Sequence, residues 1–250
     1  NDTLTSNTGK DTLVGGAGND TFIVSNASDV IQDTSTTASN AIQSSVSYVL
    51  PTNVNSLVLT GSAALTGTAN SGNDTLTSNT GKDTLVGGAG SDLFVVNNAS
   101  DVVTVGSTHG TDTIQSSVSF TASANVADLT LTGTTNLKAT GNSLANVLTA
   151  NAGNDTLTAG SGVATLIGGA GNDLFVVNNA SDVVQDGSST ASDTISSSVA
   201  YTLPTNVDSL VLTGSTALKG TANSGNDTLT SNTGVDTLVG GAGNDTFIVS

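Results

Sequence analysis

The sequence predicts an all-β fold, a β-solenoid whose strands follow one another in nine-residue steps, with two steps in each coil. Three observations predict it. The 250-residue chain repeats itself at offsets that are multiples of nine. Thr, Ser, Asn and Gly supply just over half of its residues, and these types favour strands or turns. Glu, Arg and Met are absent and Lys is scarce, so the strong helix formers are nearly missing.

The clearest repeat begins at the first residue. The segment Asn1–Val24 returns at Asn73–Val96, Asn154–Val177 and Asn226–Val249. The middle offset is longer than the other two by one nonapeptide, so the unit of insertion is the nonapeptide, as expected if it forms one structural step. We therefore divide the chain into repeat units 1–72, 73–153 and 154–225 and the start of a fourth, 226–250. We expect it to be one continuous array and a slice of a longer chain.

A weaker pattern lies between the nonapeptide runs. In the segment Asp33–Thr68, the large apolar residues Val46, Tyr48 and Leu50 occupy every second position, and Leu57 and Leu59 do so further on. Alternation of this kind is typical of half-buried strands. We expect the solenoid to continue through these segments without metal-binding turns.

Each nonapeptide has a turn half and a strand half. Glycines at positions 1, 2 and 4 permit a tight turn, and positions 7 to 9 form a short strand with a central apolar side chain pointing inward. Because two steps make a coil, an Asp at position 6 stacks on the residue two nonapeptides further along. The stacked pairs are Asp2 with Asp20, Asp11 with Asp29, Asp74 with Asp92, Asp83 with Asp101, Asp155 with Asp173, and Asp227 with Asp245.

Two further aspartates lack such a partner. Asp182 stacks on Ala164, so we expect a weak or empty site there, and Asp236 has no partner further along this chain. Stacked carboxylates repel one another unless a cation lies between them. Carboxylate and carbonyl oxygens in flexible turns suit Ca²⁺ better than Mg²⁺. With a net charge of −16, the six pairs predict that folding requires Ca²⁺.

Four nonapeptides carry a resemblance to a known family. Gly15–Ile23, Gly87–Val95, Gly168–Val176 and Gly240–Ile248 read GGAGNDTFI, GGAGSDLFV, GGAGNDLFV and GGAGNDTFI. They resemble the RTX, or haemolysin-type, calcium-binding nonapeptide. The resemblance implies a parallel β-roll, with Ca²⁺ held in the turns by the stacked aspartates and Asp182 and Asp236, and by carbonyls of the glycine region. It also implies an exported bacterial protein, often one that leaves the cell by type I secretion.

The composition argues against several other functions. Without Cys, and with His109 as the single histidine, thiolate and multi-histidine metal sites are excluded. The lack of Arg and the negative charge argue against nucleic-acid binding, and no apolar run is long enough to insert into a membrane. His109 lies in a segment of turn composition, and we interpret it as a solvated loop residue rather than a catalytic base. We expect no enzymatic activity.

The resulting hypothesis is a calcium-stabilised extracellular structural repeat protein, such as a fibre, an adhesin stalk or a surface-layer element. End-to-end association into fibres is expected, because an uncapped solenoid exposes strand edges. Ser/Thr-rich stretches such as Thr34–Ser39 and Ser188–Ser192 are candidate sites for glycans. Two alternatives remain open: a non-catalytic module of an exported enzyme, and a carbohydrate-binding adhesin.

Overall fold

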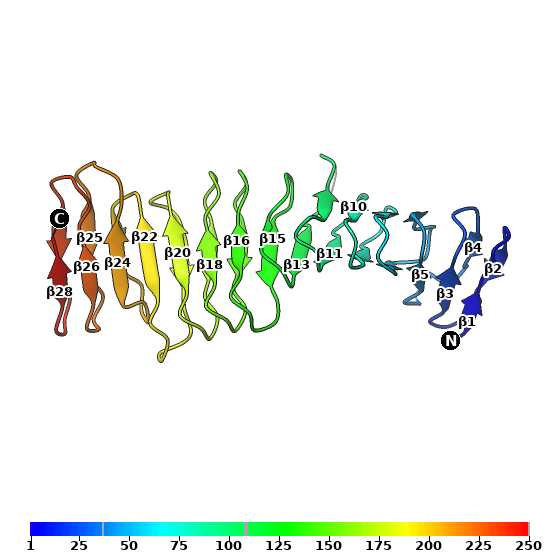
Figure 1. The fold of residues 1–250 in the computed structure, drawn as a ribbon, viewed down its shortest axis with the longest axis horizontal. Helices are drawn as coiled ribbons and strands as arrows, with labels where there is room; N and C mark the ends of the chain where they lie inside the picture. The colour runs from blue at the N-terminus through cyan, green and yellow to red at the C-terminus, as the bar shows by residue number, and fades with distance from the viewer. Residues whose placement is uncertain (37, 108–109, 250) are drawn as a thin grey trace. The chain divides into compact units, whose positions relative to one another are not determined.

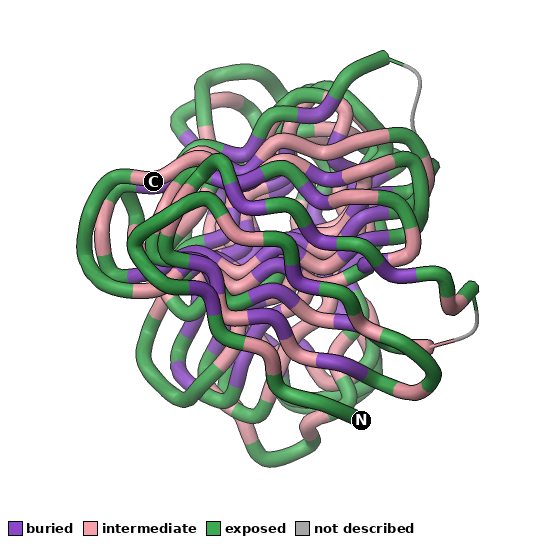
Figure 2. Tube along the Cα trace, turned by 90° about the vertical axis from the view of Figure 1, so that its right-hand side faces the viewer, coloured by how far each residue is buried: buried purple, intermediate pink, exposed green. Residues whose placement is uncertain are grey.

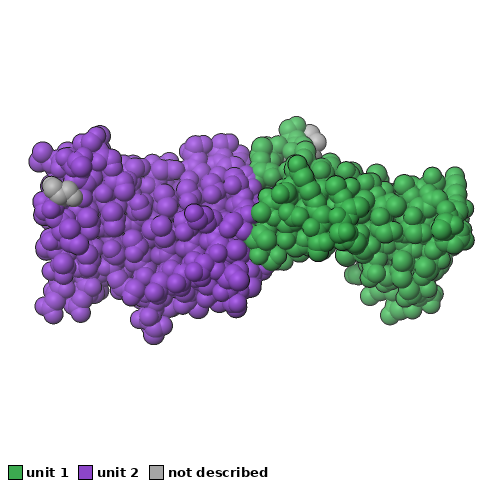
Figure 3. All heavy atoms as spheres, in the orientation of Figure 1, with its two compact units in different colours: residues 1–118, 123–126 green, residues 119–122, 127–250 purple. Residues whose placement is uncertain are grey.

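The computed structural model describes residues 1–36, 38–107 and 110–249. These residues contain 28 short strands, and the strand pairs between successive coils are parallel. The described residues include no helix, and hence none that could cross a membrane. The chain divides into two compact units, Asn1–Val118 with Ser123–Val126, and Ser119–Ala122 with Ala127–Ser250 (Figure 3). The predicted all-β solenoid is confirmed.

The first unit contains strands β1 to β13, wound so that alternate strands lie in the same sheet (Figure 1). The odd-numbered strands stack in one sheet, and the even-numbered strands pair as β2 with β4 and as β6, β8, β10 and β12. The strands are β1 Thr3–Thr5, β2 Thr12–Val14, β3 Thr21–Val24, β4 Val30–Gln32, β5 Ala41–Ser44, β6 Tyr48–Val49, β7 Ser56–Leu59, β8 Thr66–Thr68, β9 Thr75–Thr77, β10 Thr84–Val86, β11 Leu93–Val96, β12 Val102–Thr104 and β13 Thr113–Ser116.

The second unit repeats this arrangement with strands β14 to β28. Here the even-numbered strands form one long sheet, and the odd-numbered strands pair as β15 to β21 and as β23 to β27. The strands are β14 Phe120–Thr121, β15 Asp128–Leu131, β16 Lys138–Thr140, β17 Val147–Thr149, β18 Thr156–Thr158, β19 Thr165–Ile167, β20 Leu174–Val177, β21 Val183–Gln185, β22 Thr194–Ser197, β23 Tyr201–Thr202, β24 Ser209–Leu212, β25 Lys219–Thr221, β26 Thr228–Thr230, β27 Thr237–Val239 and β28 Thr246–Ile248.

The core of each unit lies between its two layers of strands. Buried and more exposed residues alternate along the strands, as Figure 2 shows, because successive side chains point to opposite faces. The central residue of the strand triplet points inward, and Leu76, Leu85 and Phe94 are completely buried. Burying one such side chain contributes about 1.5–3 kcal/mol. The inward position predicted for the apolar residue is confirmed in these steps.

The coil length depends on the kind of segment. In the nonapeptide runs the pairing register advances by two nonapeptides, as in Thr75 with Leu93 and Thr84 with Val102. Between the runs, Thr21 pairs with Ala41, Ala41 with Ser56 and Ser56 with Thr75. The first of these coils is two residues longer than a regular coil, the second three residues shorter and the third one residue longer. The three deviations cancel, and the same sequence of coils recurs in the second unit from Leu174 to Thr228.

The intervening segments therefore continue the solenoid, as expected from their alternating pattern. Leu57 and Leu59 are buried in β7, and Tyr48 and Leu50 are buried at and after β6. Val46 precedes β6 in a bend and is only half-buried. Strict alternation with Tyr48, two residues later, would have placed its side chain inward. The reason is local, because the Ser44 hydroxyl bonds the Val46 backbone and closes a bend.

The shortest coil turns through an asparagine in the left-handed region. Asn53 and its equivalent Asn206 both have φ of 68°, a conformation that Asn tolerates better than most residues. The side-chain amide of Asn53 donates to the Asp33 carbonyl, and that of Asn206 donates to the Asp186 carbonyl, each at 3.0 Å. One side chain thus fixes both the turn and its contact with the preceding coil.

Candidate calcium sites in the turns

Most of the motif aspartates connect two backbone segments. Oδ1 of Asp92 accepts the N–H of Asp74, one coil earlier, at 2.9 Å, and its Oδ2 accepts the N–H of Gly88 in its own turn at 2.9 Å. One carboxylate thus receives an N–H from its own turn and another from the stacked position. A similar pair of bonds holds Asp20, Asp29, Asp83, Asp101, Asp155, Asp173, Asp182, Asp236 and Asp245.

The structure brings each of the six predicted pairs together in adjacent coils. The earlier residue of each pair donates its N–H to the carboxylate of the later one, at 2.7 Å for Asp2 with Asp20 and 3.1 Å for Asp227 with Asp245. The two unpaired aspartates keep this bond without a second carboxylate. Ala164 donates to Asp182, and Leu218 donates to Asp236, both at 2.8 Å. These two turns therefore offer fewer acidic oxygens.

Backbone carbonyls complete the oxygen-rich surroundings of the turns. The Asn70 carbonyl lies against Gly88, and the Gly72 carbonyl lies against Gly90, so closely that a methyl group at either glycine would overlap it. Gly169 and Gly171 have the same relationship to the carbonyls of Asn151 and Gly153. Glycine at positions 2 and 4 is therefore required by the approach of the carbonyls from the preceding coil.

Ten of the fourteen motif aspartates are buried, and within the described residues only Asp20 has an ion-pair partner, the N-terminal amine. Burial raises the pKa of Asp74 to about 6, against the lowering effect of the Asn70 N–H, and the Asp92 charge adds to the rise. Burial likewise raises the pKa of Asp92, Asp173 and Asp227. Among the described residues, Oδ1 of Asp74 and of Asp227 is buried with no hydrogen-bond donor. Buried carboxylate oxygens beside carbonyl oxygens are a donor set that suits Ca²⁺, so these residues could hold the ion.

Further acidic residues outside the nonapeptide motif lie on the same edges of the coils. Asp186 and Asp193 lie at the two ends of the turn between β21 and β22, and Asp33 is the counterpart of Asp186 in the first repeat. Burial raises the pKa of Asp193 to about 7, with the charges of Asp186 and Asp173 adding to the rise. In the sequence these residues appear only as an Asp at each end of an eight-residue segment that lacks the glycine pattern. Their position beside Asp173 can be recognised only once the pairing of the coils is known.

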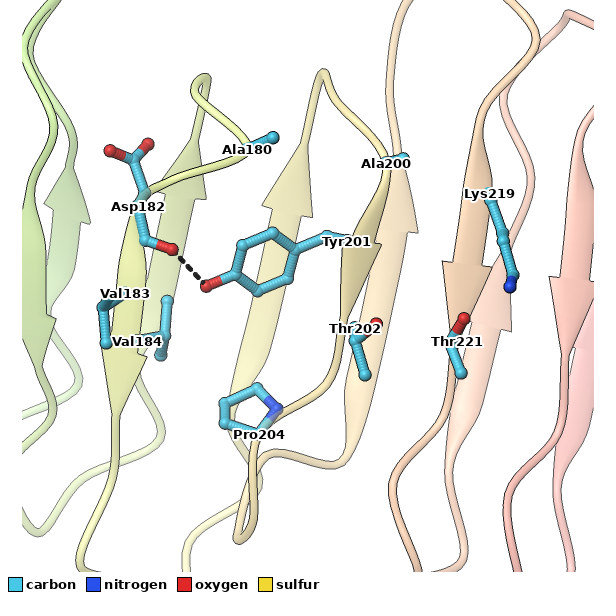
Figure 4. A pocket seen from close by; sticks show the side chains of 10 residues that line it. All are labelled: Ala180, Asp182, Val183, Val184, Ala200, Tyr201, Thr202, Pro204, Lys219 and Thr221. Carbon is cyan, nitrogen blue, oxygen red and sulfur yellow. Dashed lines mark hydrogen bonds between the residues drawn. The ribbon is translucent and has the colours of Figure 1, made fainter.

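A surface hollow lies beside Asp182 in the second unit. It has a volume of about 450 Å³ and is lined by residues such as Val184, Tyr201 and Lys219 (Figure 4). The Tyr201 hydroxyl donates to the Asp182 carbonyl at 2.9 Å, and Tyr48 bonds the Asp29 carbonyl in the same way. Both rings thus link adjacent coils. His109 lies outside the described residues.

The stacked parallel coils and their carboxylate-lined turns define a cation-binding parallel β-roll. Among known families, the RTX calcium-binding nonapeptide repeat matches in four copies, over residues 1–31, 68–103, 140–175 and 221–248. These segments make up just over half of the chain, which belongs to the RTX calcium-binding nonapeptide repeat family. Comparisons with curated proteins and with solved structures give no match. Ca²⁺ is therefore the ligand of the repeats, and the β-roll is a structural, calcium-binding fold.

Proposed function

We propose that this calcium-binding repeat protein serves as a structural element outside the cell, as a fibre, adhesin stalk or surface-layer component. Family members are typically exported, which supports an extracellular location and secretion by the type I route. In calcium-poor cytoplasm the buried carboxylates oppose folding, whereas calcium outside the cell stabilises it. Export of an unfolded chain and folding after export would then follow from the same chemistry.

The proposed ligands are the stacked aspartates together with carbonyls of the neighbouring turns. In the second repeat these are Asp74 and Asp92 with the carbonyls of Asn70 and Gly72. The ion supplies positive charge between carboxylates that otherwise repel one another. The repeat units 1–72, 73–153, 154–225 and 226–250 would then each contribute similar sites to one array.

The observation that carries the proposal is the maintained coil register. The three irregular coils between runs are together as long as three regular coils, so the next nonapeptide run begins with its aspartates on the same edges as the last. Such a solenoid extends without changing its cross-section, and its stability derives from contacts between neighbouring coils. Extension suits a spacer or a filament.

A coil stacked on β28 would bury an apolar face. Phe247 in β28 is 46 % exposed, whereas its equivalents Phe22, Phe94 and Phe175 are completely buried. Ile248 and Val249 are exposed beside it. A further coil, from the same polypeptide or from a second copy, would cover this apolar face and pair with the free edge of β28.

Light scattering and negative-stain electron microscopy of the purified chain test this proposal. We expect elongated particles that grow end to end in about 10 mM Ca²⁺, a concentration that fills weak extracellular sites, and dissociate in EGTA. Mg²⁺ is the control cation. Substituting Phe247→Asp should block growth while leaving the calcium-induced β signal in place. Particles that remain single in Ca²⁺ at high protein concentration would contradict the self-associating role.

A further inference from the structure

The turn between β21 and β22 differs from the motif turns on the same edge. It runs from Asp186 to Asp193 and is two residues longer than the motif turn Gly168–Asp173 that precedes β20. Leu174 in β20 pairs with Thr194 in β22, so the two turns stack in adjacent coils. This stacking brings Asp173 of the last motif turn against both ends of the longer turn.

The carboxylates of the longer turn have buried oxygens without donors. Asp193 is completely buried; its Oδ1 accepts the Asp173 N–H at 2.6 Å, and its Oδ2 has no hydrogen-bond partner among the described residues. Oδ2 of Asp186 is also buried and unpartnered there. A methyl group at Gly168 would overlap this Asp186 oxygen, so the glycine makes room for the carboxylate. Within the described part of the chain, no lysine forms an ion pair with these three aspartates.

The spacing of these groups suits a single ion. Ligand oxygens of Asp173, Asp186 and Asp193 all lie within 4.8 Å of one another, the one such group of three in the described part of the chain. Oxygens on opposite sides of a Ca²⁺ ion are about 4.6–5.2 Å apart, because each lies about 2.3–2.6 Å from it. We propose that Asp173, Asp186 and Asp193 form an additional Ca²⁺ site, outside the nonapeptide motif, at the end of the motif run.

The equivalent positions in the other repeats hold fewer carboxylates. In the first repeat the three positions hold Asp20, Asp33 and Asn40, and Asn40 accepts the Asp20 N–H as Asp193 accepts that of Asp173. In the second repeat they hold Asp92, Val105 and Asp112. A Cβ added at Gly87 there would meet the Val105 side chain at 3.5 Å, so an apolar group occupies the place of the second carboxylate. Affinity should fall from the third repeat to the first and then to the second.

Counting ions in the whole chain tests the site. Native mass spectrometry of the calcium-loaded chain resolves single Ca²⁺ ions. We expect Asp186→Val, which copies the second repeat, to bind one ion fewer than the wild type. The reciprocal Val105→Asp should bind one ion more. Asp128→Asn removes a charge on β15, outside the turns, and should leave the count unchanged. Equal counts in the wild type, Asp186→Val and Val105→Asp would overturn the site.

A second measurement covers the case in which Asp186→Val folds poorly. The thermal midpoint of the near-isosteric Asp186→Asn should rise less than that of Asp128→Asn when Ca²⁺ is raised from about 1 to 10 mM, because one fewer ion binds the folded state. Equal rises would overturn the proposal. The inference rests on the calcium chemistry of the proposed function, but not on its fibre role. If the wild type and the variants bind calcium in equal numbers, only the additional site is contradicted. If the chain binds calcium but does not polymerise, only the fibre role is contradicted.

Discussion

The backbone N–H of Asp83 donates a 2.8 Å hydrogen bond to Oδ1 of Asp101, which lies one coil further along the chain. The same carboxylate accepts the Asn98 N–H through Oδ2. Asp101 is therefore both an acceptor for the backbone of two turns and a candidate ligand for an ion between coils. Separate variants and calcium removal can distinguish these two roles.

Substitution of Asp101 should distinguish the hydrogen bonds from the charge. Asp101→Asn and Asp101→Ala both remove a charged ligand, but Asn keeps an acceptor oxygen for the Asp83 N–H. We expect Ala to be less stable than Asn by about 1 kcal/mol, the usual contribution of one hydrogen bond. Urea unfolding in saturating Ca²⁺ measures the difference. Equal stabilities would mean that the carboxylate contributes through the ion alone.

Calcium removal should unfold the nonapeptide runs. In EGTA the buried carboxylates, including Asp74 with its pKa raised to about 6, lose the ion that offsets their repulsion. We expect a cooperative loss of the β signal in far-UV circular dichroism, restored by Ca²⁺ and not by Mg²⁺. A full β signal in EGTA would show that the aspartates act as turn residues without metal.

Two turn glycines should respond differently to alanine. At Gly88 the new methyl group would overlap the Asn70 carbonyl, whereas at Gly187 no atom of the described chain lies within 4 Å. We expect Gly88→Ala to destabilise the chain by about 1–3 kcal/mol, as overpacking does. Gly187→Ala should leave stability within about 0.5 kcal/mol. Thermal unfolding of the two variants in the same buffer compares them, and a similar loss in both would contradict the role of the close carbonyl.

The inward phenylalanines should differ according to the coil that covers them. Phe94 is completely buried and Phe247 is 46 % exposed. We expect Phe94→Ala to lower the free energy of unfolding by about 3–5 kcal/mol, the range for truncating a buried aromatic residue. Phe247→Ala should cost clearly less, because half of its ring gains little from burial. Urea unfolding with Ca²⁺ tests this, and equal losses would indicate that the last coil is covered in solution by another copy.

The regular part of the fold was predictable because each nine-residue step contains the residues that determine how it stacks on the steps one coil away. Glycine, Asp and Leu at fixed positions determine the turn, the stacked carboxylate and the core residue, so Asp74, Asp92 and Leu76 could be placed from the periodicity of the sequence. The assignment of the stacked aspartates as ligands remains a prediction from that pattern, as do the boundaries of the repeat units.

The irregular coils were not predictable in detail. Their unequal lengths depend on an eight-residue turn and on the left-handed Asn53, and neither feature follows from a nine-residue period. For the same reason Asp186 and Asp193 could not be connected with Asp173. They become neighbours through the pairing of β20 with β22, a contact between residues more than two nonapeptides apart.

The restored register after each irregular stretch has a consequence for how such a gene can change. A duplication or deletion of one irregular stretch would bring together two nonapeptide runs. Their strands and acidic edges already have the same register, so no further change at the junction would be needed. Recombination between near-identical copies, such as Pro51–Gly81 and Pro204–Gly234, would then alter the number of coils while leaving every junction chemically the same. We therefore expect the lengths of related chains to differ by multiples of nine residues.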